Sequence, residues 1–192
     1  MAKKSTRKAP RASARRAKPA ARSARPAKSA PFDAKAAMEH AITSLDFARE
    51  MTLKLLTDWP KNKLAHQFSP ADNHPLWTLG HLGTSAEWFA SVLDKKAGPS
   101  AKLNATFGGG SKPSANPKDY PSLAKLITLY NAGHQRLVNA LRNTKDPLAK
   151  PDAKMDWLRD GLHAAEMAIW HEGWHAGQLS TLRRQHGLPG VM

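Results

Sequence analysis

Residues 171–179 read HEGWHAGQL, and the first five letters place two histidines and a glutamate in a pattern that can hold a metal ion. His171 and His175 are four residues apart, so a helix presents them on the same face, one turn from each other. The pattern His-Glu-x-x-His is also the signature of zinc peptidases, in which both histidines bind the metal and the glutamate acts as the base. The rest of the chain must decide between a peptidase and another kind of metal site.

The residues after His175 do not support a peptidase. Peptidases with the extended signature carry a glycine three residues and a histidine six residues after the second histidine, where this chain has Gln178 and Thr181. Peptidases with a distant glutamate ligand need an acid further along, and no Asp or Glu follows His175. Glu172 lies about 100° around the helix from His171, so we expect it at the rim of the site or behind a ligand rather than as a peptidase base.

A third histidine is available on another predicted helix. His81 lies on the core-facing stripe of residues 75–95, and small residues accompany His171 and His175 on theirs, which leaves room for a bound group. The chain has no cysteine, so nitrogen and oxygen atoms are the only ligands it can offer. We therefore expect His81, His171 and His175 to hold one divalent metal, zinc or nickel, with one coordination position left open.

The other histidines and the tryptophans are expected to serve the fold. We expect His74 to cap a helix or face solvent, and His134 and His163 to lie in the core or beside the ligands. The six tryptophans should mainly pack the core, with some available to line a pocket. Gln178 and Glu172 are the polar candidates to orient ligands or move a proton, and no catalytic residue is assigned.

Four amphipathic segments must position these residues. Apolar side chains recur at helical spacing over residues 33–58, 75–95, 121–143 and 155–186, and no segment reads as a strand. This pattern predicts an all-α fold, a four-helix bundle. The linker at 96–120 can span the length of a helix of about 30 Å, so the second and third helices can run parallel. Its FGGGS segment is expected to be a flexible turn rather than a phosphate-binding loop.

The N-terminal tail differs in composition from the rest of the chain. Residues 1–30 contain eleven Lys or Arg and no acid, whereas residues 31–192 contain nineteen against fifteen. A tail of Lys, Arg, Ala, Pro and Ser buries little apolar surface, so we expect residues 1–31 to be disordered and residues 32–192 to form the domain. Its composition resembles that of linker-histone tails and suits sequence-independent binding of DNA or RNA. A passive extension and a transit peptide are the alternatives.

No segment of the sequence is suited to a membrane. No apolar run approaches about 20 residues, and no apolar stretch follows the N-terminal charges as it does in a signal peptide. The absence of cysteine fits a cytoplasmic location, with association to the nucleoid if the tail binds nucleic acid. The sequence leaves open whether the protein forms a homodimer.

The sequence NHPLWTLGHL, followed far downstream by HEGWHAGQLSTLRRQHGLPG, resembles the DinB-like superfamily of four-helix metalloproteins. The resemblance covers residues 33–191, including the linker FGGGSKPSANPKDYPS, and excludes the basic tail. It implies an up-down-down-up bundle with His81, His171 and His175 as the metal ligands. It also places Gln178 in a Gly-Gln pair that recurs in the family.

Two classes of function are open to such a protein. Characterised relatives imply transferases or isomerases that use bacillithiol, mycothiol or glutathione, with a metal that lowers the pKa of a bound thiol. A water bound in the same position would give a hydrolase instead. In the second class the metal is structural or sensory, and the basic tail tethers a non-catalytic module to nucleic acid. A site that opens beside a pocket favours an enzyme, and a saturated buried site favours the binding module.

Overall fold

Five α-helices make up most of the chain that the structure describes. The structure is a computed structural model and describes residues 31–151 and 155–191. The helices are α1 (Ala34–Leu55), α2 (Pro75–Asp94), α3 (Ala101–Phe107), α4 (Leu123–Arg142) and α5 (Gly161–Gln185), with short 3-10 turns at Lys61–Lys63 and Pro117–Asp119. No strand occurs within the two described ranges, which confirms the predicted all-α class.

Each long helix begins at a residue whose side chain accepts a hydrogen bond from a free backbone N–H group. Asp33 does this for α1, His74 for α2, Ser122 for α4 and Asp160 for α5. These caps satisfy donors that have no partner inside the helix. Pro75 follows the cap of α2, where its restricted φ suits the first helical position.

The structure differs from the predicted helices in two places. The last helix begins at Gly161 rather than at residue 155, because Asp160 caps it and the residues before form a turn in which Leu158 N–H donates to the Met155 carbonyl over 3.1 Å. The helix α3 lies inside the segment expected to be a linker. Its seven residues bury only Phe107, so it has no apolar stripe that the sequence could reveal.

Phe107 attaches the end of α3 to α2. Its side chain is 2% exposed, and its ring lies so close to Gly80 of α2 that a Cβ on that glycine would overlap it. After Phe107 the chain turns, with Ser111 N–H donating to the Gly108 carbonyl over 3.0 Å. The linker is therefore held against α2 at Gly80, the residue directly before His81.

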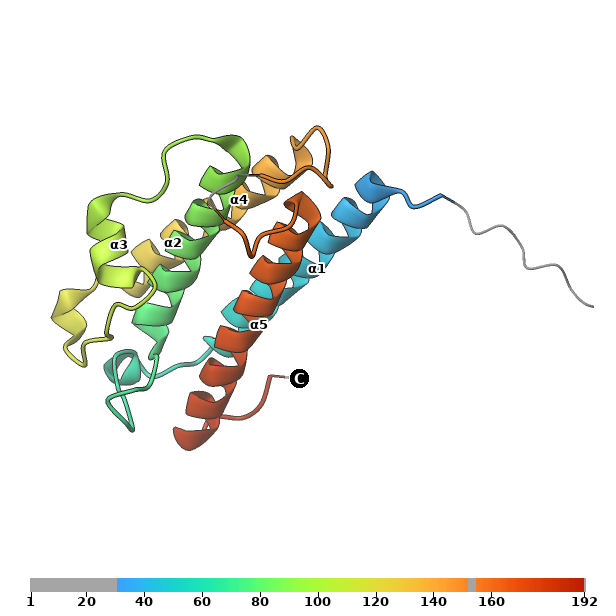
Figure 1. The fold of residues 1–192 in the computed structure, drawn as a ribbon. Coiled ribbons are helices and arrows are strands. Elements are labelled where there is room, and N and C mark those ends of the chain that lie inside the picture. The colour runs from blue at the N-terminus through green and yellow to red at the C-terminus, as the bar shows by residue number, and fades with distance from the viewer. Residues whose placement is uncertain (1–30, 152–154, 192) are drawn as a thin grey trace, which may run out of the picture. The chain divides into compact units, whose positions relative to one another are not determined.

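The helices pack most extensively in two pairs, α2 with α4 and α1 with α5 (Figure 1). Two glycines bring α2 and α4 together. A Cβ on Gly133 would collide with the carbonyl oxygen of Gly83, and a Cβ on Gly83 would lie 2.9 Å from the Cα of Tyr130. The backbones of α2 and α4 can approach this closely because neither residue has a side chain.

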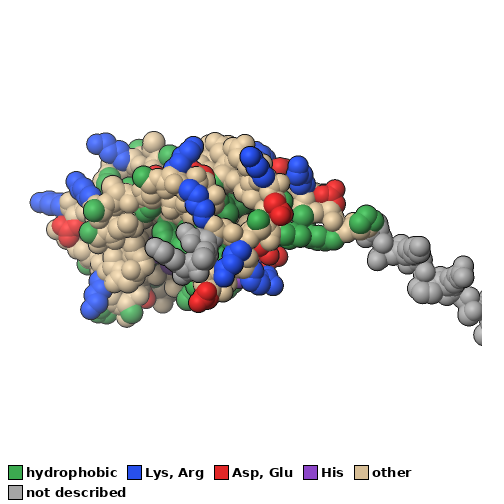
Figure 2. Space-filling view, turned by 45° about the horizontal axis from the view of Figure 1, so that its top comes forward, with side chains coloured by type: hydrophobic (Ala, Val, Ile, Leu, Met, Phe, Trp, Pro, Cys, Tyr) green, Lys and Arg blue, Asp and Glu red, His purple; other side chains and the backbone are tan. Residues whose placement is uncertain are grey.

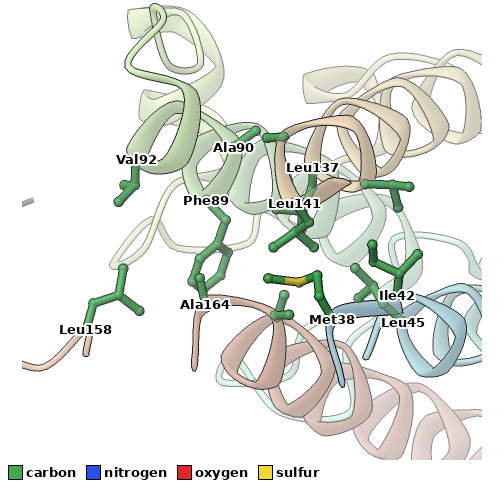
Figure 3. Close-up of a cluster of buried hydrophobic side chains, with 14 residues drawn as sticks. Met38, Ile42, Leu45, Phe89, Ala90, Val92, Leu137, Leu141, Leu158 and Ala164 are labelled. Atoms are coloured by element: carbon green, nitrogen blue, oxygen red, sulfur yellow. The ribbon is translucent and has the colours of Figure 1, made fainter. Parts of the chain in front are cut away.

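Two clusters of buried apolar side chains fill the interior. The first, shown in part in Figure 3, joins Met38, Ile42, Leu45, Phe89, Val92, Leu137, Leu141, Leu158, Ala164 and Ala168. The second joins Leu55, Trp59, Leu76, Leu82, Leu126, Tyr130, Leu179 and Leu182. Along α5 the residues of the first cluster end at Ile169 and those of the second begin at Ala176, so residues 171–175 lie where the two clusters meet.

The surface of the described domain carries charges of both signs. On the face in Figure 2, Lys and Arg side chains are spread over the domain, with Asp and Glu side chains among them. None of the helices within residues 31–151 and 155–191 is long and apolar enough to cross a membrane. The tail that is predicted to be disordered comprises residues 1–31, and all of it except Pro31 lies outside the described residues.

Candidate metal centre

Three imidazole rings meet between α2 and α5. His81 comes from α2, His171 and His175 come from α5, and one ligand nitrogen of each lies within 4.8 Å of the other two. His171 Nε2 is 3.0 Å from His81 Nε2 and 3.2 Å from His175 Nε2. His81 and His175 are buried and His171 is half-buried. The structure thus brings together the three histidines that the sequence singles out.

Hydrogen bonds behind two of the rings determine which nitrogen faces the centre. His81 Nδ1 is 2.6 Å from the carbonyl oxygen of Phe107. His175 Nδ1 is 2.9 Å from Gln178 Oε1, and Asn73 Nδ2 donates to the same oxygen over 3.1 Å. Because a carbonyl oxygen only accepts, each Nδ1 carries the hydrogen and each Nε2 keeps a free lone pair.

This donor set fits a divalent metal. Two Nε2 lone pairs face His171 Nε2, which can offer at most one hydrogen, so the three nitrogens cannot all be paired with one another. A cation between them would satisfy all three. Tetrahedral zinc with Zn–N distances near 2.0–2.1 Å separates its ligand nitrogens by about 3.3 Å. The separations of His171 Nε2 from the Nε2 atoms of His81 and His175 are close to that value.

Burial keeps these rings in the neutral form that binds metal. Burial, followed by the neighbouring His175 and His81, lowers the pKa of His171 to about 3. Burial and then His81 lower the pKa of His175 to about 4, although the hydrogen bond with Gln178 opposes this. Burial also lowers the pKa of His81, against the effect of its hydrogen bond to the Phe107 carbonyl. At neutral pH a metal therefore has no imidazolium proton to displace.

The indole ring of Trp77 packs against one face of the His81 imidazole ring. The two ring centroids are 4.5 Å apart and their planes differ by 11°, so the rings are stacked. Trp77 Nε1 donates to Ser111 Oγ over 3.1 Å, which ties the indole to the turn after α3. The linker thus orients His81 twice, through the Phe107 carbonyl and through this tryptophan.

A cavity of about 510 Å³ adjoins the cluster on the side of His81 and His171. Its described lining comes from α2, α5, the end of α3 and the segment before α5, and is largely aromatic and apolar. The lining includes Thr84, Trp88, Phe89, Trp157, Met167 and Trp170. A volume of this size is in the range of small-molecule sites. The histidine cluster therefore lies beside a cavity rather than in a closed core.

Glu172 faces away from the three histidines. Its side chain is buried at 5% exposure, and its Oε1 accepts hydrogen bonds from Thr52 Oγ1 at 2.6 Å and from the Tyr130 hydroxyl. Burial raises the pKa of this carboxyl group. Glu172 is expected from the sequence at the rim of the site or behind a ligand. The rim is wrong because the side chain is buried, and its hydrogen bonds are to Thr52 of α1 and Tyr130 of α4 rather than to a histidine of the cluster. Gln178 lies beside His175, whose Nδ1–H donates to its Oε1.

The remaining histidines lie outside the cluster. His74 caps α2 through Nδ1, which accepts from Trp77 N–H, and it is fully buried, so the cap is confirmed and the solvent-facing alternative is wrong. His134 is buried with Nε2 2.7 Å from Asp46 Oδ1. His163 accepts from a backbone N–H at the start of α5.

The tryptophans divide between the core and the surface. Trp77 is 5% exposed and packs in the core as expected. Trp170 and Trp174 are each 54% exposed, so these two do not pack the core. Trp170 lines the cavity, as some of the tryptophans are expected to do. The ring of Trp174 stacks on the ring of His175, with 17° between the two ring planes.

A family comparison agrees with this site. The model of the DinB superfamily matches residues 44–179, more than two thirds of the chain. The chain belongs to the DinB superfamily. The match includes all three clustered histidines and Gln178, and it excludes the basic tail of this DinB-superfamily protein. The comparison with curated proteins gives no match.

Two features of the site could not be read from the sequence of this DinB-superfamily protein. The Phe107 carbonyl that orients His81 is a backbone atom 26 residues away, so no side-chain pattern points to it. Asn73, which holds Gln178, precedes the cap of α2 in a polar connection and resembles an ordinary loop residue. Both act through tertiary contacts with segments that the sequence presents only as linkers.

Proposed function

We propose that this DinB-superfamily protein binds one divalent metal, zinc or nickel, through His81, His171 and His175, and that it transfers a low-molecular-weight thiol to an electrophilic small molecule. The proposal rests on one observation above others: three neutral imidazoles turn their Nε2 atoms toward one another beside a cavity. A structural site would be closed on all sides by protein ligands, whereas three ligands beside a cavity leave a position for substrate.

The ligand set favours activation of a thiol. A divalent metal held by three neutral nitrogens keeps its +2 charge and acts as a Lewis acid that lowers the pKa of a thiol or water. The chain has no cysteine, so the sulfur has to arrive on a cosubstrate such as bacillithiol, mycothiol or glutathione. In the transfer the S–H bond breaks and an S–C bond forms at the electrophilic carbon. Either a double bond at that carbon opens and its other atom takes the proton, or the bond from that carbon to a leaving group breaks and the leaving group takes the proton.

The protein's own residues prepare this site. Gln178 and the Phe107 carbonyl hold the hydrogens on Nδ1 of His175 and His81, so both rings present Nε2 toward Nε2 of His171. Glu172 is engaged with Thr52 and Tyr130 and serves as a buried support of α5 rather than as a proton carrier. Gln178 is thus the better of the two polar candidates to orient a ligand.

Metal binding is tested by elemental analysis of purified protein. The wild type should carry about one zinc or nickel per chain, and the double variant His171→Ala, His175→Ala should carry none. His163→Ala is the matched control, because it removes a histidine from the same helix outside the cluster. Equal metal content in the wild type and the double variant would rule out this site.

The reaction is tested with the metal-loaded protein. A model electrophile is supplied with bacillithiol, mycothiol or glutathione, and ester and amide substrates are assayed in parallel. Thiol-dependent turnover that is lost in His81→Ala supports transfer. Thiol-independent hydrolysis that is lost in the same variant would assign a hydrolase instead, and a metal-loaded protein without turnover in any assay favours the binding module.

We also propose that residues 1–30 bind DNA or RNA without sequence preference. The support is their eleven Lys or Arg with no acid, since such a segment releases the counterions of nucleic-acid phosphates on binding. Full-length protein should bind tightly at low salt and lose affinity steeply as salt rises, and a variant that begins at Pro31 should not bind. Equal binding of nucleic acid by the two proteins would show that the tail is a passive extension.

We further propose that α1, α2, α4 and α5 form an up-down-down-up bundle. The first apolar cluster supports this order, since it joins the N-terminal halves of α1 and α5 to the C-terminal halves of α2 and α4. The second cluster joins the opposite halves of the same helices. A parallel α2 and α4 need a long connection, and residues 95–122 provide one.

A further inference from the structure

The cavity beside the histidine cluster contains one buried polar atom without a partner. Thr84 is 2% exposed, and its Oγ1 has no hydrogen-bond partner among the described residues. A threonine in a helix commonly donates to the carbonyl four residues earlier, as Thr128 does to Ala124 over 3.0 Å. Thr84 does not, although leaving a buried hydroxyl unpaired costs free energy. The hydrogen bond of Thr84 is thus left for a group outside the described residues to complete, and Thr84 is one of the residues that line the cavity.

Thr84 lies between the histidine cluster and an aromatic wall. His81, Thr84 and Trp88 follow one another at spacings of three and four residues, so they lie along one face of α2. Trp157 stacks on Trp88 with ring planes 12° apart and centroids separated by 6.2 Å. Trp170 of α5 lines the same cavity. A molecule in the cavity would therefore contact aromatic rings at one end and approach His81 at the other.

The described lining of the cavity also carries no acidic or basic side chain. There is no Lys, Arg, Asp or Glu among the residues of α2, α3, α5 and the segments beside them that line it. A charged group on a ligand would lose hydration at the aromatic end of the cavity without meeting a charged side chain among the described lining residues. The flat indole rings instead favour a planar apolar body, which stacks on aromatic side chains.

We propose that the cavity binds a small, uncharged aromatic molecule whose single hydroxyl or carbonyl group pairs with Thr84 Oγ1. The hydroxyl of threonine both donates and accepts, so either group can complete the bond. This inference rests on the proposed function, because it assigns the class of the electrophilic substrate of that site. Thr84 acts as a binding residue that orients the ring beside the histidines.

The test compares p-cresol and toluene, which differ by one hydroxyl, as probes in isothermal titration calorimetry. Wild-type protein, loaded with zinc and also stripped of metal with a chelator, should bind both probes. Thr84→Val should weaken p-cresol binding about tenfold, since one hydrogen bond is lost, and leave toluene binding unchanged. The stripped protein matters because it removes any direct contact of the hydroxyl with metal.

Thr78→Val is the matched control. Thr78 is equally buried and also in α2, but its Oγ1 donates to the Asn73 carbonyl over 3.2 Å and it does not line the cavity. This variant should bind both probes as the wild type does. Trp170→Ala, which removes part of the aromatic wall, should weaken binding of both probes alike.

The metal content of every sample separates this inference from the proposed function. Wild-type affinity for p-cresol in Thr84→Val, or failure of both probes to bind a wild-type protein that carries one metal per chain, would overturn the assignment of the cavity. Thr84-dependent binding in a protein that takes up no metal would support the cavity and overturn the metal site.

Discussion

At the scale of single residues, the centre depends on which ring nitrogen carries the hydrogen. His81 and His175 each donate from Nδ1 to a carbonyl oxygen, so their Nε2 atoms are free to bind a metal. A ligand histidine that loses such a partner can rotate or change tautomer, which weakens metal binding. Gln178 is the partner that can be replaced by mutation, because the other acceptor is a backbone atom.

Gln178→Leu should lower zinc affinity by roughly 10- to 100-fold without removing a ligand, because His175 loses the acceptor that holds its ring. Competition with a zinc-binding dye measures the dissociation constant. Gln185→Leu, an exposed change on the same helix, is the control and should keep wild-type affinity. Wild-type affinity in Gln178→Leu would show that the ring needs no such partner.

At the scale of helices, the site depends on how closely α2 approaches its neighbours. Gly83 and Gly133 allow contact between the backbones of α2 and α4, and Gly80 accommodates the Phe107 ring from the linker. The Phe107 carbonyl then reaches His81. A wider separation at either contact would move His81 relative to the two histidines of α5.

Gly133→Ala should destabilise the protein by about 2 kcal/mol or more, since the new Cβ collides with the carbonyl oxygen of Gly83 and two backbones must separate. Urea denaturation followed by circular dichroism measures the free energy of unfolding. In contrast, Gly173→Ala in α5 has no heavy atom within 4 Å of its new Cβ and should be neutral or stabilise by up to about 1 kcal/mol. A neutral Gly133→Ala would contradict the close packing of α2 on α4.

At the scale of the whole molecule, buried neutral histidines couple folding to pH. The cap of α2 is one of them: His74 Nδ1 accepts from Trp77 N–H, and Nε2, 2.9 Å from the Ser114 carbonyl, carries the hydrogen. Burial lowers the pKa of His74, as it does for the histidines of the cluster. Since unfolded histidines have a pKa near 6.5, the unfolded chain binds more protons than the folded one below that pH.

The metal-free protein should therefore lose stability as the pH falls from about 7 to 5, and its stability should not depend on these histidines above about pH 7. Urea midpoints at several pH values measure the slope. His74→Asn should reduce the slope, because asparagine caps a helix and does not titrate. An unchanged slope in that variant, with native structure retained, would show that His74 does not contribute to the pH dependence.

Much of the arrangement can be predicted from local sequence. Helical periodicity and capping residues place α1, α2 and α4 to within a few residues, since both signals arise within a single helix. The one-turn spacing of His171 and His175, together with His81 on a core-facing stripe, identifies the histidine cluster. These signals can be read without tertiary information, because residues three or four positions apart in the sequence lie on the same face of a helix.

The tertiary structure alone decided what surrounds that cluster. The helix α3 and the Phe107 carbonyl depend on contact with α2, and the direction of Glu172 depends on partners in α1 and α4. The cavity and its unpaired Thr84 hydroxyl come from four separate segments of the chain. Sequence spacing determines which residues share a helix face, whereas the partner that each face meets is determined by contacts between residues distant in the chain.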